Sequence, residues 1–437
     1  MIGGISLEDK KEASITEWSI RKPLPAQKVY IPLQEAAGAS LKCTVHLNQR
    51  VAVGDKIADA SDPQSVPLYS GVDGQVTDFV EVDLPQGRRS RAVEIKTSGY
   101  DAPPKHWERS QQDWKQLSRS KLLAVFRERG LVELNASMMP LHTKIKQASK
   151  RTSLLIVNAC ESEPYLTAEY ALMMSYPNEI LKGAEVLRQA VDAERVLIVT
   201  ENNKLEAAEL LQSKRFLRKL DHFDVKIVKS RYPQGSPVSL LRDFAGYDLR
   251  DWAEGFGAPA IIFDVATIFA VYEAVFLDKP LFERVVTIGG ECIAESHNVW
   301  FPFGTYVKDA MKVCRGLLRA PRKIVLGGPM RGMSIPHENV PIQAGTQGVL
   351  ALPKEVATEE KTRACIRCGL CVEVCPVAIS PVMITLAAER DEMDLAREYG
   401  AEHCIECGNC TYICPSKRPM LDLIRQTLPK EQLQKSG

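Results

Sequence analysis

The sequence lacks any long hydrophobic run. Its most apolar stretch, residues 258–275, is interrupted by Asp264 and Glu273, whereas a membrane-spanning helix needs about 18 or more apolar residues in a row. An excess of either charge is also missing, because 56 Lys and Arg face 55 Asp and Glu. A balanced chain has no overall field that would attract nucleic acid or an acidic surface. These absences favour an ordinary globular protein that meets a membrane only through partner proteins.

No secretory leader is expected from the first residues either. The first residues, MIGGISLEDKKEAS, carry charges where the apolar region of a signal peptide would lie. The 437 residues are enough for several domains with sizeable cores. The chain nevertheless contains 12 cysteines. Outside a secreted context so many thiols indicate metal ligation in a reducing compartment, which for a bacterium is the cytoplasm.

Most of these cysteines fall in two copies of one pattern, Cys-x2-Cys-x2-Cys-x3-Cys-Pro. The first copy covers residues 365–376 and the second covers residues 404–415. This spacing is the bacterial two-cluster ferredoxin signature, so it predicts two [4Fe–4S] clusters and a protein that transfers electrons. In that signature the three closely spaced thiolates of one copy bind one cluster, and the fourth cysteine of the copy binds the other cluster.

The crossed signature predicts both sets of ligands. The first cluster is expected on Cys365, Cys368, Cys371 and Cys414, and the second on Cys404, Cys407, Cys410 and Cys375. Paired zinc knuckles and disulfides are the alternatives. Zinc sites usually consist of two Cys-x2-Cys pairs with no third cysteine three residues further on. The spacing therefore favours iron–sulfur clusters.

Ahead of the cysteines, the chain changes pattern several times. Residues 27–97 alternate short β-type runs with turns, and the segments 53–58 and 72–76 resemble barrel-sandwich hybrids of the lipoyl-carrier type. Those carriers modify a lysine at a hairpin tip, but the tip expected here, residues 71–74, has none. The pattern therefore favours a structural or docking module.

The middle of the chain alternates strands and helices. Buried strands are expected at 153–158, 195–200 and 224–228, with helices between them, which is typical of a parallel sheet. Short β segments around a helix near 307–317 then indicate a small α+β module. The domains expected on these grounds are 1–100, 115–250, 255–350 and a mainly helical 355–425.

The polar turn after the first of these strands is a candidate binding site. Residues 157–165 leave the strand as Val-Asn-Ala-Cys-Glu-Ser-Glu-Pro-Tyr, and Rossmann-like sheets bind nucleotides at the carboxyl ends of their strands. Asn and Glu side chains there could hydrogen-bond a flavin edge or a ribose. The alternative is a turn that only caps the next helix, and the spacing does not separate the two.

Several short stretches spread along the chain match one family. They are residues 2–5, 22–25, 163–168, 201–204, 232–235, 280–287, 327–330 and 404–417. On these stretches the chain resembles the RnfC subunit of the Rnf (Rsx) membrane electron-transport complex over essentially its whole length. Its middle domain is also similar to the NADH-binding flavoprotein subunit of respiratory complex I. Residues 283–336 look like the soluble-ligand-binding β-grasp domain of that second family.

The resemblance implies a fold, cofactors and partners. The fold would be multidomain α/β and α+β: a barrel-sandwich hybrid, a Rossmann-like sheet domain, a β-grasp module and a helical dicluster ferredoxin domain. FMN would lie in the sheet domain and exchange hydride with NADH, and the residues implied to hold them are Lys144, Asn158, Glu161, Glu163 and Glu201. The implied partners are the other subunits of a membrane complex and a ferredoxin or other redox carrier, with no nucleic acid. The chain would lie peripherally on the cytoplasmic face of the inner membrane.

The chain departs from the family in the glycine-rich loop that holds the flavin and the nicotinamide nucleotide. With Pro140 and Lys144 aligned, the family glycines are replaced by Glu133, Asn135, Ala136 and Met138. A further family glycine is Val199 here. Side chains then project where bare backbone must approach phosphate. The replacements predict loss of NADH binding and leave FMN binding open.

Two functions therefore follow from the sequence. In the first, the chain is an electron-transfer subunit that relays single electrons through its two clusters and has lost the NADH site. In the second, it is an active FMN-dependent NADH dehydrogenase subunit that exchanges electrons between NADH and ferredoxin. The replaced glycines favour the first.

Overall fold

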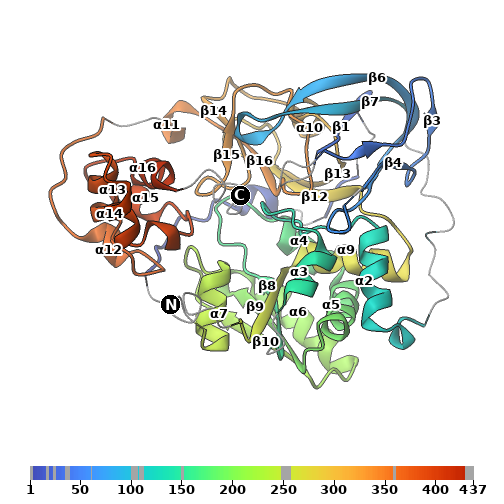
Figure 1. Cartoon of the computed structure of the whole chain (residues 1–437), viewed down its shortest axis with the longest axis horizontal. Helices are drawn as coiled ribbons and strands as arrows, with labels where there is room; N and C mark the ends of the chain where they lie inside the picture. The colour runs from blue at the N-terminus through green and yellow to red at the C-terminus, as the bar shows by residue number, and fades with distance from the viewer. Residues whose placement is uncertain are drawn as a thin grey trace.

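The computed structural model describes residues 3–15, 19–22, 26–34, 40–60, 62–99, 107, 113–148, 152–247, 257–357 and 361–428. Figure 1 shows the C-terminal helices as a separate group on one side of the molecule, with the N-terminal strands and the green sheet on the other. In the ranges given above, we find no helix whose length and apolar character would let it span a membrane.

The N-terminal domain consists of short strands in two small sheets with the orders β1-β7-β6-β3 and β2-β4-β5. The strands are β1 (Lys28–Pro32), β2 (Lys42–Cys43), β3 (Arg50–Val51), β4 (Lys56–Asp59), β5 (Leu68–Tyr69), β6 (Asp73–Asp83) and β7 (Arg89–Gly99). Val29, Val93 and Ile95 point inward and are fully buried in its core. Gly71, at the expected hairpin tip, lies so close to the third domain that a Cβ would come within 2.6 Å of Pro302 Cβ. The tip is therefore packed against a neighbour, as a structural module requires.

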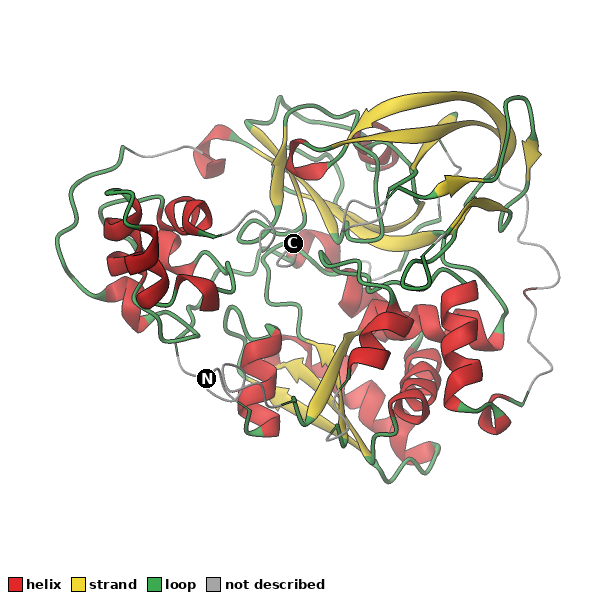
Figure 2. Cartoon of the chain, viewed as in Figure 1, coloured by secondary structure: helices red, strands yellow, loops and turns green. Residues whose placement is uncertain are grey.

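The second domain is a parallel sheet with the order β10-β9-β8-β11. Its elements are α2 (Arg119–Glu128), α3 (Leu141–Gln147), β8 (Leu154–Ala159), α4 (Ala168–Ser175), α5 (Pro177–Val191), β9 (Arg195–Glu201), α6 (Leu205–Leu217), β10 (Phe223–Val228), α7 (Pro237–Ala245), β11 (Ala260–Asp264) and α9 (Val265–Phe276). Leu155 and Val157 of β8 pack with α5 and α9 on one face, and Ile156 packs with α7 on the other. Figure 2 shows these strands between α7 and the remaining helices. In chain order this is the 3-2-1-4 arrangement of Rossmann-type sheets.

The sheet extends beyond residue 250, where the sequence placed the end of this domain. β11 pairs with β8 in parallel, from Ala260 opposite Leu154 to Asp264 opposite Asn158. This strand was hidden in the sequence because its apolar residues run directly into the apolar helix α9. A continuous apolar run of this kind has no helix or strand period that separates the two elements.

The third domain is a mixed sheet with the order β13-β12-β16-β14-β15, crossed by α10. Its elements are β12 (Glu283–Gly289), β13 (His297–Pro302), α10 (Val307–Val313), β14 (Lys323–Leu326), β15 (Met333–Ile335) and β16 (Gly348–Leu352), followed by α11 (Lys354–Ala357). The first and last strands, β12 and β16, lie side by side and parallel. This is the β-grasp arrangement that the resemblance implied.

The C-terminal domain is helical, as expected. It contains α12 (Leu370–Glu373), α13 (Pro381–Ala388), α14 (Met393–Glu398), α15 (Asn409–Ile413) and α16 (Met420–Thr427). The short helices α12 and α15 each begin inside one copy of the cysteine motif and contact each other. The domain core combines apolar residues such as Ile384 and Ile424 with buried motif cysteines, so the cysteine sites lie at its centre.

Candidate functional site

Cys375 of the first motif copy lies with the cysteines of the second. A small cavity of about 20 Å³ is lined by Cys375, Cys404, Cys407 and Cys410 together with apolar residues of α16. Burial, together with the nearby thiol of Cys375, raises the pKa of Cys404 to about 12 and that of Cys407 to about 11. These four cysteines thus line one cavity, which supports proposing them below as the ligands of the second cluster.

Cys414 is brought to the first motif copy by a backbone contact between distant segments. The Arg363 amide donates to the Ser416 carbonyl at 2.9 Å, and the Ser416 hydroxyl donates to the Ala364 carbonyl at 2.9 Å. These bonds hold the chain just before Cys365 against the chain just after Cys414. The structure therefore brings the start of the first motif copy close to the end of the second copy.

Each motif copy also aims a backbone amide at its first sulfur. The Arg367 amide lies 3.4 Å from Cys365 Sγ, and the Glu406 amide lies 3.4 Å from Cys404 Sγ. Hydrogen bonds of this kind favour the charged thiolate, which is the form that binds iron. Soft thiolate donors, grouped across the two copies and met by amides, fit iron–sulfur clusters.

The crevice at the carboxyl ends of β8 and β11 is the position where a Rossmann-type sheet binds its ligand. It lies at the switch point of the strand order, between the first and fourth strands. The side chains that end these strands are hydrogen-bonded to each other: Asn158 Nδ2 donates to Asp264 Oδ1 at 2.7 Å. Asn158 also donates to the Gly235 carbonyl at 3.1 Å. The polar group predicted to face a flavin is therefore engaged within the chain.

The segment that replaces the glycine-rich loop is anchored in the same crevice. Asn135 Nδ2 donates to Asp264 Oδ2 at 2.7 Å. Lys144 forms an ion pair with Glu133 and donates to the Ile262 carbonyl at 2.7 Å, so its ammonium lies against the carboxyl end of β11. Met138 adopts a φ of 44°, a conformation that glycine adopts far more readily. Side chains thus fill this segment at the positions where the resemblance implies glycines.

This arrangement is a test of whether the residues present fit a flavin. A phosphate needs backbone amides or cations that are free to turn toward it. Here Lys144 is held by a carboxylate and a carbonyl, and Glu133 would add a negative charge beside a phosphate. The loop residues do not fit a flavin phosphate bound in the family manner.

The turn after β8 is also held by internal contacts. The Glu161 carboxylate accepts the amide of Glu169 at 3.0 Å and that of Tyr170 at 3.4 Å, so it caps the first turn of α4. The Glu161 amide donates to Glu201 Oε2 at 3.1 Å, and Glu201 forms a buried ion pair with Lys204 at 2.7 Å. The sequence left two roles open for this turn, cofactor binding and capping of the next helix. These contacts are those of a helix cap.

Glu163 connects the sheet domain to the β-grasp domain. Its carboxylate accepts the amides of Met330 at 3.0 Å and Arg331 at 2.9 Å. The Met330 carbonyl in turn lies against Gly408, where a Cβ would be only 3.2 Å away. A residue predicted to bind a cofactor thus positions the loop that covers the second motif copy.

The sequence did not single out Asp264 or Lys11. Asp264 joins Asn135 to Asn158, and the Lys11 ammonium donates to the Glu161 carbonyl at the back of the crevice. Asp264 could have been found, because it follows the apolar triplet 261–263 as Asn158 follows its strand. Lys11 gave no local signal, since it reaches the crevice from a segment 150 residues away.

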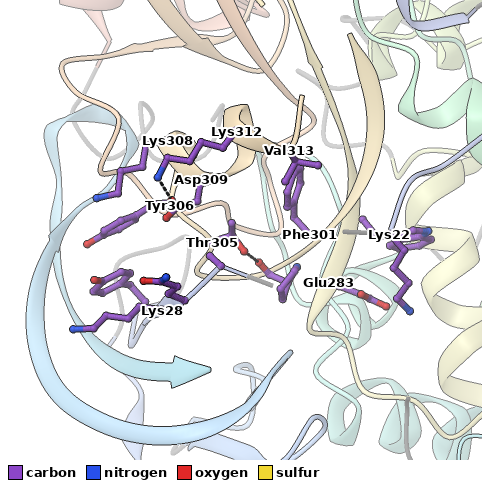
Figure 3. A pocket seen from close by; sticks show the side chains of 15 residues that line it. Lys22, Lys28, Glu283, Phe301, Thr305, Tyr306, Lys308, Asp309, Lys312 and Val313 are labelled. Carbon is purple, nitrogen blue, oxygen red and sulfur yellow. Dashed lines mark hydrogen bonds and ion pairs between the residues drawn. The ribbon is translucent and has the colours of Figure 1, made fainter. Parts of the chain in front are cut away.

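A second cavity, of about 520 Å³, lies between the N-terminal domain and the β-grasp domain (Figure 3). Lysines lie around it, but Lys28 is ion-paired with Glu94 at 2.7 Å and Lys312 with Asp309 at 2.8 Å. Two of the four lysines that line this cavity are thus held by carboxylates, and Lys22 and Lys308 line it as well.

Family models match three parts of the chain. The RnfC barrel-sandwich hybrid domain matches residues 1–100, the Nuo51 FMN-binding domain matches 126–273, and the 4Fe-4S dicluster domain matches 357–415. The last match confirms the iron–sulfur interpretation of the cysteines over the zinc alternative. The first two confirm the expected types of the N-terminal and sheet domains.

The RnfC subunit of the proton-translocating ferredoxin:NAD(+) oxidoreductase complex of Clostridium ljungdahlii is 31% identical over 402 residues, which is 91% of this chain and 86% of that protein. The chain belongs to the RnfC family. Among other relatives, the RnfC subunit of the ion-translocating oxidoreductase complex of Yersinia pestis is 32% identical over 91% of this chain and 64% of its own length. The corresponding RnfC subunit of Rhodobacter capsulatus is 31% identical over 91% of this chain and 76% of its own length.

One solved structure supports the fold of this RnfC-family chain. An NAD+-reducing [NiFe]-hydrogenase in the air-oxidized state superposes with a TM-score of 0.50 at 16% identity. The match covers 73% of this chain and 66% of the hydrogenase chain. At that identity the likeness concerns the fold alone.

Proposed function

We propose that this chain is the iron–sulfur electron-transfer subunit of an Rnf-like, membrane-associated complex. The observation that carries the proposal is the position of Cys375. This cysteine belongs to the first motif copy but lies beside Cys404, Cys407 and Cys410 of the second copy. A single-metal site would need no such exchange of cysteines. When bound, a [4Fe–4S] cluster accepts and donates one electron at a time. The chain would then relay single electrons between partner proteins.

The proposed ligands are the two crossed cysteine sets: Cys365, Cys368, Cys371 and Cys414 for one cluster, and Cys404, Cys407, Cys410 and Cys375 for the other. The chain supplies the thiolates, the amides of Arg367 and Glu406 that point at sulfur, and the helical core that excludes water from most of the ligands. Such hydrogen bonds and burial are the means by which a protein sets a cluster's reduction potential.

In this proposal the chain neither binds NADH nor transfers hydride. The reason is the crevice, where Lys144 is paired with Glu133, and Asn158 is bonded to Asp264. Lys144, Asn158, Glu161, Glu163 and Glu201, which the resemblance implied as cofactor ligands, would instead act as structural residues. The names of the relatives support partner subunits within a membrane complex. We place the chain peripherally on the cytoplasmic face of the inner membrane, held there by those subunits.

The second candidate is an active FMN-dependent NADH dehydrogenase subunit. The match to an FMN-binding domain over residues 126–273 favours it, as does the Rossmann order of the sheet. It requires the Glu133–Lys144 pair to open and the loop to rearrange when the nucleotide arrives.

Anaerobic titration of the reconstituted full chain separates the two candidates. The proposal expects no flavin released on acid denaturation, no bleaching of cluster absorbance by NADH, and full bleaching by dithionite or a reduced ferredoxin. Rapid bleaching by NADH would overturn the proposal and establish the dehydrogenase.

A further inference from the structure

The two copies of the cysteine motif are internal controls for each other. They align residue by residue as CIRCGLCVEVCP, from 365, and CIECGNCTYICP, from 404. The third residue of each copy, Arg367 or Glu406, has a positive φ, of 57° and 52° respectively. The two backbones are thus alike, so a difference in their surroundings reflects what lies outside the motif.

The second copy is covered by the chain's own segments. The Tyr232 hydroxyl donates to the Cys407 carbonyl at 2.8 Å, and the Met330 carbonyl lies at Gly408. Glu406 is 7% exposed and forms an ion pair with Arg425 at 2.5 Å. Tyr232 and the Met330 backbone therefore cover the second copy at Cys407 and Gly408, and the charge of Glu406 is neutralised by Arg425.

The same face of the first copy is open. Cys368, the counterpart of buried Cys407, is exposed. Ile366 is 66% exposed, whereas its counterpart Ile405 is partly buried. A Cβ on Gly369 would meet no atom within 4 Å. The segment around the first cluster therefore presents cysteine, isoleucine and backbone directly to solvent.

This open face carries positive charge. Lys361, Arg363 and Arg367 are all exposed, and among the described residues none of the three forms an ion pair with a carboxylate. Lys417 is exposed and lies beside them, because the Thr362 hydroxyl donates to the Lys417 carbonyl at 3.2 Å. Glu373 is the acidic residue of the described segment 361–373. Exposed cations therefore flank the exposed Ile366 in the segment that carries Cys365 and Cys368.

We propose that this outer face, made by residues 361–369 and Lys417, is the docking surface for a small acidic electron-carrier protein. The acidic surface of the carrier would meet Lys361, Arg363 and Arg367, and its apolar centre would cover Ile366 and Cys368. That contact would supply the cover that Tyr232 and Met330 supply at the other copy. The inference rests on the proposed function, since it requires a cluster at Cys365, Cys368, Cys371 and Cys414.

A second copy of this chain is a poor occupant of the face. In a two-fold dimer the same patch faces itself, so the three cations would oppose one another. Like charges placed together across an interface repel one another and disfavour the contact. An acidic carrier instead gains both steering and specificity from opposite charge.

The test is the rate at which a reduced, acidic plant-type [2Fe–2S] ferredoxin reduces the reconstituted full chain, followed anaerobically by stopped flow. Arg363→Glu/Arg367→Glu should lower the second-order rate constant at least about tenfold at low ionic strength, since steering changes on-rates by 10- to 1,000-fold. The loss should shrink in about 0.5 M salt, where charges are screened within a few ångströms. Arg218→Glu is the matched control, because Arg218 is also exposed but lies at the end of α6 in the sheet domain. It should leave the rate near that of the wild type.

Iron content and dithionite reduction must first match in all variants, so that a slower rate is not a lost cluster. Equal rates for the double variant and the wild type would overturn the docking surface. So would an equal loss in the Arg218 variant, or a concentration-dependent dimer that disappears in the double variant. The electron source in this comparison is ferredoxin, so its outcome does not depend on NADH. Bleaching of the clusters by NADH in a separate experiment would contradict the proposed function and leave the comparison of rates unchanged.

Discussion

Cys375 lies next to one set of cysteines in sequence and next to the other set in space. Proline follows it, and its neighbour Val374 accepts the Gly4 amide at 2.8 Å and Asn409 Nδ2 at 3.3 Å. These contacts hold the end of the first motif copy against the second. A single thiol in this position connects the two halves of the domain.

Replacing this thiol should damage the cluster of the other motif copy. Cys375→Ala is expected to lower the iron content from about eight to about four per chain, because two cubanes hold about eight irons. The remaining signal should be that of the cluster on Cys365, Cys368, Cys371 and Cys414. Iron analysis together with EPR measures both, and Cys414→Ala is the reciprocal control. Loss of the first cluster in the Cys375 variant would show that the ligation is not crossed.

A buried lysine should make stability depend on pH. Burial, assisted by the charge of Lys204, lowers the pKa of Lys11 from 10.5 to about 8. Below pH 8 this lysine is charged in the folded and the unfolded chain, and burying the charge costs stability. Between pH 8 and 10.5 the unfolded chain binds more protons, so stability rises with pH by up to about 3 kcal/mol.

The comparison variant is Lys11→Met, which has no proton to release. The melting temperature of the wild type should gain on that of Lys11→Met as the pH rises from 8 to 10.5, while the exposed-lysine variant Lys42→Met should follow the wild type. Parallel melting curves for all three proteins across this range would contradict a buried, charged Lys11.

At the residue scale, sequence reasoning found the chemistry that is encoded locally. The cysteine spacing indicated iron–sulfur clusters, and the family match over 357–415 agrees. The missing loop glycines were also visible. The partner of the replacement Asn135 was not visible, since it meets Asp264 across 129 residues, and neither was the contact of Lys11 with Glu161 across 150 residues. Such contacts depend on the tertiary fold and leave no periodic signal.

At the scale of elements, the loop at Met330 and Arg331 links the sheet domain to the second motif copy. Two amides of this loop bind the Glu163 carboxylate, and its Met330 carbonyl covers Gly408. Burial raises the pKa of Glu163 above its ordinary value, while the two amides favour the charged form. The carboxylate therefore holds the loop in place through these two hydrogen bonds.

Removing the Glu163 carboxylate should release the loop and expose the second cluster. In Glu163→Ala the loop loses two hydrogen bonds to a charged group, each contributing about 1.5–3 kcal/mol. A chelator should then bleach that cluster at least about tenfold faster than in the wild type, with EPR distinguishing the two clusters. Glu206→Ala is a suitable control, because Glu206 binds Tyr170 on α4 instead. An unchanged rate, or faster loss of the cluster at the first motif copy, would show that Glu163 does not hold the loop over the second cluster.

Element prediction succeeded where the sequence had a clear period or punctuation. The strands expected at 153–158, 195–200 and 224–228 correspond to β8, β9 and β10. Pro177 separates α4 from α5, as its missing amide requires. The strand β11 was missed because residues 260–276 are apolar in both the strand and the helix that follows.

At the scale of the whole molecule, the described cores differ in what holds them together. The sheet domain has a large apolar core in which residues such as Leu155, Ile180 and Phe263 are buried. The core of the helical domain includes Cys371, Cys375, Cys410 and Cys414, which are proposed as cluster ligands. A domain whose interior is formed partly by metal ligands depends on the metal for its stability.

Stripping the iron should therefore unfold one region and spare the rest. After chelation, amides in 361–428 are expected to exchange hydrogen at rates close to those of an unfolded chain. Peptides from 154–264 should keep their wild-type protection. Hydrogen exchange with mass spectrometry, with and without clusters, makes the comparison. Retained protection in 361–428, or loss throughout, would contradict a metal-dependent domain.

The closed crevice has a consequence for metabolism. Flavins hold two electrons and can therefore connect a hydride carrier to one-electron centres, whereas each cluster holds a single electron. Under the proposed function, with Asn135, Asp264 and Asn158 bonded to one another at the carboxyl ends of the strands, this chain would carry no two-electron reservoir. Its redox state would follow the fraction of reduced one-electron carrier around it and stay insensitive to the ratio of NADH to NAD+. A cell could then drive such a complex while its nicotinamide pool is fully oxidised.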